Sequence, residues 1–303
     1  MLRAAVIGEP GAGSTTVLGL LYAALIRWGG DRADPFRFFA PPAALAYLSS
    51  SYQRLMAGEF PEPPSDPEIA TVQIDLAYRR RPGLLDRIRP GPEFPEVPQV
   101  ECRWVRAPLH DLARSLAGIG APPPGGGAGL AGCRVPIFVV PADGTGATEG
   151  TGTASAPGTD ENIREILQRL AGPSAVQGGG PAPPVHPVFV FTKLDRISPD
   201  LLKSSGVAGS LDEEALLADR PRLATGFLGR ILPRTLEGLG GRANPPAGPP
   251  VFFSYVHPEP PVPGAAPRLR MRASPGRLVE PEYPWTQYRS LLEHLGELAS
   301  GAE

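Results

Sequence analysis

The stretch VFVFTKLD, residues 188–195, joins a short apolar run to a polar ending. The apolar part, residues 188–191, follows Pro187 and is too short for a helix, so it predicts a fully buried strand. Thr192, Lys193 and Asp195 stand at the carboxyl end of this strand. Open α/β sheets bind their ligands at that edge. The stretch therefore predicts an α/β fold with a binding site after residue 191.

The polar ending has the residue types needed to recognise a guanine base. Asp195 offers two acceptor oxygens to the ring N–H and the exocyclic amine of guanine, a pair of donors that adenine lacks. The stem of Lys193 can cover the face of the base, and Thr192 can tie this loop to a phosphate-binding turn. The chain has only one other lysine, Lys203, so such a tetrad is rare by chance. A polar strand-to-loop cluster without a ligand is the alternative.

A glycine-rich turn near the amino end is the second motif. Residues 2–7 read as a strand, residues 8–16 read GEPGAGSTT, and residues 17–28 read as a helix. Glycines let successive backbone N–H groups face inward, and the helix amino end adds partial positive charge, which together favour an anion. Ser14 stands where the phosphate-loop pattern has lysine. The candidate phosphate-binding residues are Gly8, Gly11, Gly13, Ser14, Thr15 and Thr16. A structural turn without a ligand is the alternative.

Further strands and helices are expected along the chain. The apolar patterns predict strands over residues 71–78, 99–105, 135–140 and 251–254. The loop at Ser254 is expected to present a backbone N–H to guanine O6. Helices are expected over residues 160–170, 214–217 and 225–239, the last interrupted by Pro233, and an apolar stripe over residues 285–298 predicts a final helix.

In this order the motifs resemble the Ras-like and translation-factor class of P-loop GTPases. The segment GEFP, residues 58–61, is similar to one that certain bacterial GTPase domains carry before their second strand. The resemblance implies a three-layer P-loop NTPase fold with a mostly parallel sheet and GTP or GDP as the ligand. It runs through nearly the whole chain in motif order. We therefore expect a single GTPase-like domain over residues 1–303 with Pro/Gly-rich loop insertions.

Several positions depart from that family. After the strand at 99–105 comes RAPLH, where Pro108 and His110 match, but Arg106 stands at the position of the magnesium-holding Asp. Leu109 replaces the glycine that senses the γ-phosphate, and Ser65 is a weak substitute for a magnesium-binding threonine. By resemblance, Thr15 is the candidate metal ligand and His110 orients water. From its position alone, we hypothesise that Arg106 neutralises phosphate directly and makes nucleotide binding independent of magnesium. The alternatives are a loop histidine and a surface arginine that points away.

These departures favour a guanine-nucleotide-binding switch or scaffold whose hydrolysis is weak or absent and which works with a protein partner. The cofactor is GTP or GDP, while the altered residues weaken the case for magnesium. A working GTPase that uses Arg106 and His110 is one alternative. An interaction module that keeps the fold and binds no nucleotide is the other.

Composition bounds the classes of protein that need considering. Forty prolines and 37 glycines concentrate in loops at residues 119–132, 144–158, 172–187, 240–250 and 258–267. The net charge of −2 and the absence of a long basic stretch argue against nucleic-acid and lipid-surface binding. The two cysteines, Cys102 and Cys133, are expected to be buried free thiols. No signal peptide or bilayer-spanning run is found in the sequence, so we expect a soluble cytoplasmic protein.

Overall fold

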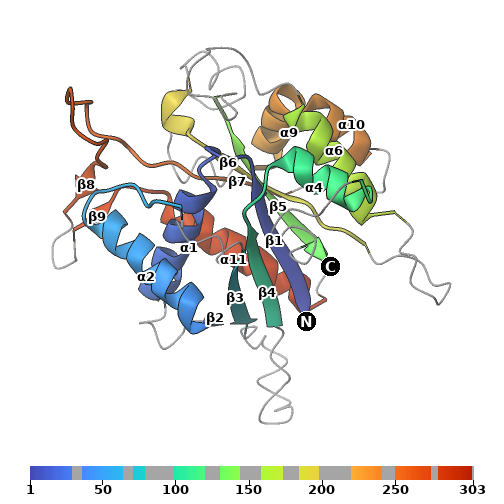
Figure 1. Ribbon diagram of the computed structural model, residues 1–303, viewed down its shortest axis with the longest axis horizontal. Helices are drawn as coiled ribbons and strands as arrows, with labels where there is room; N and C mark the ends of the chain where they lie inside the picture. Colours follow the sequence, from blue (N-terminus) through green and yellow to red (C-terminus); the bar gives the residue numbers. More distant parts are fainter. Residues whose placement is uncertain are drawn as a thin grey trace, which may run out of the picture.

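The computed structural model describes residues 1–28, 36–63, 71–78, 99–119, 130–143, 158–172, 184–197, 220–240, 250–273 and 279–301. Within these ranges a seven-stranded sheet has the order β2-β3-β4-β1-β5-β6-β7 (Figure 1). The strands are β1 (Leu2–Gly8), β2 (Phe36–Phe39), β3 (Thr71–Tyr78), β4 (Gln99–Val105), β5 (Val135–Pro141), β6 (Val188–Thr192) and β7 (Val251–Phe253).

The sheet is mostly parallel, as the sequence predicts. Strands β4, β1, β5, β6 and β7 run parallel to one another, whereas β3 is antiparallel to both β4 and the edge strand β2. Parallel strands covered on both faces are apolar throughout, and β5 and β6 are buried at every position. All six predicted strands are confirmed, while β2 was not expected.

Helices cover both faces of the sheet (Figure 1). One face carries α1 (Ser14–Trp28), α2 (Pro42–Met56) and α11 (Trp285–Ala299). The other carries α4 (Leu109–Leu116), α6 (Thr159–Leu170), α9 (Arg220–Ile231) and α10 (Pro233–Gly240). Alternate residues of β1 enter the two cores, because successive side chains of a strand point to opposite faces. Ala4 and Val6 join the first core, and Ala5 and Ile7 join the second.

Some helix predictions need correction. Helix α1 begins at Ser14 instead of residue 17, and helices α2 and α4 were not predicted. The expected helix over residues 225–239 is two helices, because Pro233 begins α10. Proline lacks an N–H, which the first helical position does not use. The expected helix over residues 214–217 lies outside the described residues.

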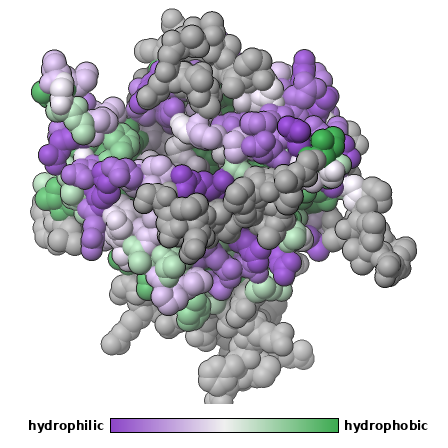
Figure 2. Space-filling model, in the orientation of Figure 1, coloured by the Kyte–Doolittle hydropathy of each residue, from purple (hydrophilic) through white to green (hydrophobic). Residues whose placement is uncertain are grey.

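The remaining elements are small. The short strands β8 (Met271–Arg272) and β9 (Glu280–Pro281) pair with each other, and the 3-10 helix η1 (Leu194–Arg196) follows β6. Hydrophilic side chains gather over α6, α9 and α10 in the upper right of Figure 2. The described helices include none that is both long and apolar enough to cross a membrane.

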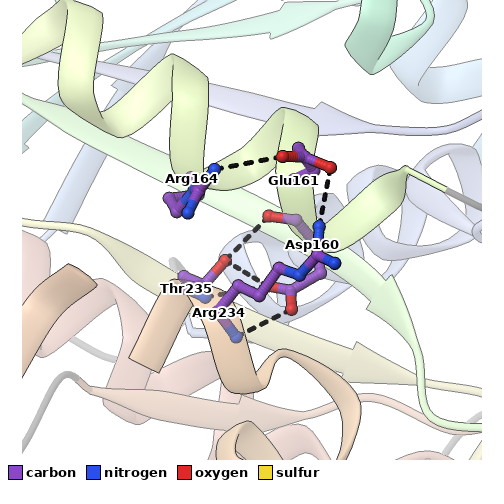
Figure 3. Close-up of polar contacts among 5 residues, drawn as sticks. All are labelled: Asp160, Glu161, Arg164, Arg234 and Thr235. Carbon is purple, nitrogen blue, oxygen red and sulfur yellow. Dashed lines mark hydrogen bonds and ion pairs between the residues drawn. The ribbon is translucent and has the colours of Figure 1, made fainter. Parts of the chain in front are cut away.

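One carboxylate joins α6 to the start of α10 (Figure 3). The Asp160 side chain accepts hydrogen bonds from the backbone N–H groups of Arg234 at 2.8 Å and Thr235 at 2.9 Å. It also accepts one from the Thr235 hydroxyl at 2.6 Å. The first N–H groups of a helix have no partner within the helix, so this contact caps α10 from a distant part of the chain. Glu161 adds an ion pair with Arg234 at 2.7 Å.

Replacing Asp160 with alanine should therefore lower the free energy of unfolding by about 2–3 kcal/mol, because a charged cap and its hydrogen bonds are lost together. Urea unfolding followed by circular dichroism measures the change. The control is Glu165→Ala, which removes an exposed ion pair with Arg169 within the same helix. Exposed pairs contribute about 0–1 kcal/mol. Equal effects of the two substitutions would contradict the capping role.

Both cysteines are buried free thiols, as expected. Burial raises the pKa of Cys102 and of Cys133 to about 12. Because the thiolate is the reactive form, iodoacetamide at pH 8.5 should modify the native thiols at least about 100-fold more slowly than the thiols in urea. Mass spectrometry of the alkylated protein measures both rates. Rapid labelling of the native protein would show that the thiols are accessible and ionised.

Candidate functional site

A cavity of about 740 Å³ opens at the carboxyl ends of β1, β4, β6 and β7. Ligand-binding pockets typically have volumes of about 300–1,000 Å³. The predicted nucleotide-binding residues all line it: Gly8, Gly11, Gly13, Ser14, Thr15, Thr16, Thr192, Lys193, Asp195 and Ser254. Arg106 lines it as well, and His110 does not. The fold thus brings together residues that are up to 246 positions apart in the sequence (Gly8 to Ser254).

The glycine-rich turn forms one wall of the pocket. Its first reversal is closed by a hydrogen bond from the Ala12 N–H to the Glu9 carbonyl at 2.9 Å. Gly11 and Gly13 have φ of 82° and 89°, a left-handed conformation that favours glycine. Helix α1 begins directly after Gly13, at Ser14, so its unpartnered first N–H groups and its positive end lie at the pocket wall. This arrangement suits an anion.

Thr192 joins this turn to the tetrad, as the sequence predicts. Its buried hydroxyl donates a hydrogen bond to the Ala12 carbonyl at 2.6 Å. Lys193 follows with φ of 56°, and within the described residues it is alone among non-glycine residues in having a positive φ. Such a conformation costs about 1–2 kcal/mol, and strained backbone of this kind is concentrated at functional sites. The 3-10 helix η1 then begins at Leu194, and Asp195 lines the pocket.

The Asp195 carboxyl group is half-buried in the pocket wall. Burial raises its pKa, while a hydrogen bond from its own backbone N–H and the charges of Arg196 and His257 lower it. Asp143 contributes a further, smaller rise in the pKa. Partial removal from water strengthens any hydrogen bond that this carboxylate accepts from a ligand.

Ser254 lies in the pocket, but its own N–H is not the one that this loop could present to guanine. Its N–H donates to the Phe191 carbonyl at 2.7 Å, which extends the contact between β7 and β6. Its hydroxyl shares a hydrogen bond with the Tyr288 hydroxyl at 2.6 Å. Ser254 therefore has no N–H to offer a base. The next two residues, Tyr255 and Val256, also line the pocket and follow the sheet contact.

The two candidate catalytic residues are separated. Arg106 is exposed and lines the pocket. His110 lies in the first turn of α4, because the helix begins at Leu109, and its Nε2 atom is 3.1 Å from a carboxylate oxygen of Asp111. The His110 side chain is 58% exposed. The expected loop position of His110 is wrong, and the structure does not bring His110 to the pocket wall.

Glu9 is a pocket residue that the sequence did not single out. Its carboxylate accepts a hydrogen bond from the Leu109 N–H at 3.2 Å and so joins the glycine-rich turn to the start of α4. Burial raises the pKa of Glu9, opposed by the Leu109 N–H and by His110, and Asp111 adds a smaller rise. The one available signal was an acidic residue inside a turn that otherwise suits anions. Phe60, Trp104 and Arg196 also line the pocket and were not predicted.

The residues present do not fit a magnesium ion held by protein carboxylates. The candidate metal ligand, Thr15, forms a side-chain hydrogen bond with Tyr47. Burial raises the pKa of Tyr47, and this hydrogen bond opposes that rise. The position that resembles a metal-holding Asp is Arg106, whose guanidinium repels a cation. Ser65 lies outside the described residues. Across the described ranges, no three His, Cys, Asp or Glu side chains gather into a metal-binding group.

No family model matches the chain, and no curated protein matches its sequence. Any functional assignment therefore rests on the chemistry of the pocket.

Proposed function

We propose that the protein binds a guanine nucleotide and acts as a GTPase-like switch or scaffold with weak or absent hydrolysis. The observation that carries the proposal is the hydrogen bond of 2.6 Å from Thr192 to Ala12. This bond joins the candidate base-reading loop after β6 to the candidate anion-binding turn after β1. Both line one cavity, and the positions of β1 and β6 in the sheet set the distance between them.

Base selection is assigned to Asp195. Its carboxylate accepts two hydrogen bonds from guanine, whereas the corresponding edge of adenine presents no such pair of donors. Hydrogen bonds to charged groups contribute about 1.5–3 kcal/mol each, which is enough to discriminate between the two bases by more than tenfold. The stem of Lys193 is assigned to the face of the base.

The phosphate end binds more weakly than a lysine-containing loop would. Ser14 donates a neutral hydrogen bond worth about 1 kcal/mol, while a charge-assisted bond contributes about 1.5–3 kcal/mol. The backbone N–H groups of α1 and its dipole remain as anion-binding elements. The expected consequence is an affinity at least about tenfold lower than with lysine at this position.

Slow or absent turnover follows from the same residues. Phosphoryl transfer depends on positive charge placed around the phosphates and on a group that orients the attacking water. Among the described residues that line the pocket, Arg106 is the candidate cation at the β4 side, and His110 lies outside the pocket wall. Without turnover, the output of the protein depends on a protein partner that distinguishes the loaded from the empty pocket.

Titration with GDP tests the proposal, with ADP as competitor and with and without magnesium. Trp104 lines the pocket, so its fluorescence provides a signal without a labelled ligand. We expect a saturable fluorescence change with GDP that an excess of ADP neither reproduces nor reduces, together with release of phosphate from GTP no faster than in buffer. Equal displacement by ADP would contradict base recognition. Absence of binding at high micromolar concentrations would favour the nucleotide-free interaction module.

A further inference from the structure

The order of the strands defines which way a ligand runs in the pocket. Asp195 follows β6, the glycine-rich turn follows β1, and Arg106 follows β4, in a sheet ordered β4-β1-β5-β6. Neighbouring strands are about 4.8 Å apart, so β1 lies about 10 Å and β4 about 14 Å from β6. A ligand whose base contacts Asp195 therefore extends past the turn toward β4, and its last phosphate is the group nearest that end.

Glu9 stands at that end of the pocket. Its carboxylate reaches from the turn after β1 to the Leu109 N–H, which begins the helix that follows β4. A backbone N–H in this place is a natural donor for an anionic ligand, and here the protein's own carboxylate accepts it. The negative charge of Glu9 thus lies at the end of the pocket where the negative charge of a terminal phosphate would also lie.

The balance of charges at this end does not favour a further phosphate. Arg106 is the cation on the same side, and it is exposed, so water screens its attraction. Glu9 is half-buried, so its repulsion of a nearby anion is screened less. Burial already disfavours the charged form of Glu9 and raises its pKa. A neighbouring phosphate would disfavour that charged form further.

We infer that the pocket takes guanine ligands with few phosphates, guanosine mono- or diphosphate, and disfavours the triphosphate because the Glu9 carboxylate occupies the terminal-phosphate end. This inference rests on the proposed function and narrows it. A protein that discriminates against the triphosphate responds to the concentration of GDP or GMP. These ligands have no γ-phosphate, so binding them requires no hydrolysis. Glu9 acts as a specificity-determining residue through its charge.

The test compares guanosine, adenosine, GMP, GDP and GTP by calorimetric titration at constant ionic strength in EDTA, so that ligand charge is not altered by magnesium. Wild-type protein, Glu9→Gln and Glu297→Gln are titrated in parallel. Glutamine keeps the oxygen that accepts the Leu109 N–H and removes the charge. Glu297 is an exposed residue of α11 that is absent from the pocket wall, which makes it a matched charge control.

We expect wild type and Glu297→Gln to bind GTP about tenfold more weakly than GDP, and Glu9→Gln to abolish that difference. The inference is overturned if wild type binds GTP as tightly as GDP, or if the difference persists in Glu9→Gln. Failure of the proposed function has a distinct result, because then guanosine itself does not bind better than adenosine in any of the three proteins.

Acidification provides an independent readout of the Glu9 charge. Protonation of Glu9 should tighten GTP binding to wild type as the pH falls through the pKa of Glu9, which burial raises, and bring it toward the value for Glu9→Gln. His110 and Asp111 of α4, Arg106 and the ligand phosphates also respond to pH or contribute charge nearby. They are shared by both proteins, so the shrinking difference between wild type and variant isolates Glu9. A difference that stays constant down to the lowest pH at which both proteins remain folded overturns the inference.

Discussion

Replacing Asp195 with asparagine should lower the affinity for guanosine and GDP by about 100-fold or more. The substitution removes a charged acceptor and sets an amide N–H₂ against the donors of the base, and charged hydrogen bonds contribute about 1.5–3 kcal/mol each. Titration of Trp104 fluorescence measures the loss, because Trp104 and Asp195 line the same pocket.

Inosine makes this experiment sharper, because it lacks the exocyclic amine of guanosine. Wild type should bind inosine at least about tenfold more weakly than guanosine, and the variant should not distinguish the two. Asp75→Asn is the control, since Asp75 lies on β3 and accepts a hydrogen bond from Gln73. Unchanged guanosine affinity in Asp195→Asn would show that this carboxylate does not read the base.

The same variant should not be less stable than the wild type. Burial raises the pKa of Asp195, so the folded state favours the neutral carboxyl group. A raised pKa contributes stability below the unfolded pKa, and that contribution is lost as the pH rises through the folded pKa. At pH 7 the wild-type carboxylate carries this penalty and asparagine does not. Lost binding with retained stability would mark Asp195 as a functional residue.

Replacing Phe191 with alanine should lower the free energy of unfolding by about 3–5 kcal/mol, because a fully buried aromatic side chain leaves a cavity. Phe191 packs against Phe227 of α9 with ring centroids 5.3 Å apart and against Phe253 of β7 at 6.3 Å. Phe227 and Phe253 are 5.2 Å apart, which completes a three-ring cluster. The cluster supports the strand that carries Thr192.

Urea unfolding of Phe191→Ala measures this loss, with Phe39→Ala as control. Phe39 lies on the edge strand β2 and is 60% exposed, so its removal should change stability by less than about 0.5 kcal/mol. A loss below about 1 kcal/mol in Phe191→Ala would mean that the aromatic cluster does not support β6. Phe191 precedes Thr192 in the chain. We therefore also expect that the molecules of Phe191→Ala that remain folded bind GDP more weakly than the wild type does.

The hydrogen bond between Thr192 and Ala12 could be predicted from the sequence, whereas another contact at the same pocket could not. The residue types predicted that a threonine at the end of β6 would tie the tetrad to the turn, and the contact of 2.6 Å is present. The same reasoning did not foresee that the Ser254 N–H would donate to Phe191. Both are contacts between distant segments. Only the first belongs to a motif whose two halves can be recognised separately.

The sequence by itself determined the buried strands, the glycine-rich turn and the tetrad, because each depends on residues close together in the chain. Runs such as β5 and β6 are apolar along their whole length, and a left-handed turn requires Gly11 and Gly13. These signals were sufficient for a mostly parallel α/β sheet with a pocket at its carboxyl edge.

Only the tertiary structure decided which side chains meet in that pocket. Helix α4 begins at Leu109, which presents its N–H to Glu9 and places His110 in the first turn, outside the pocket wall. The edge strand β2 and the cap that Asp160 provides for α10 likewise depend on distant partners. Local patterns report propensity and burial, whereas hydrogen-bond partners and helix starts depend on which segments the folded sheet brings within a few ångströms.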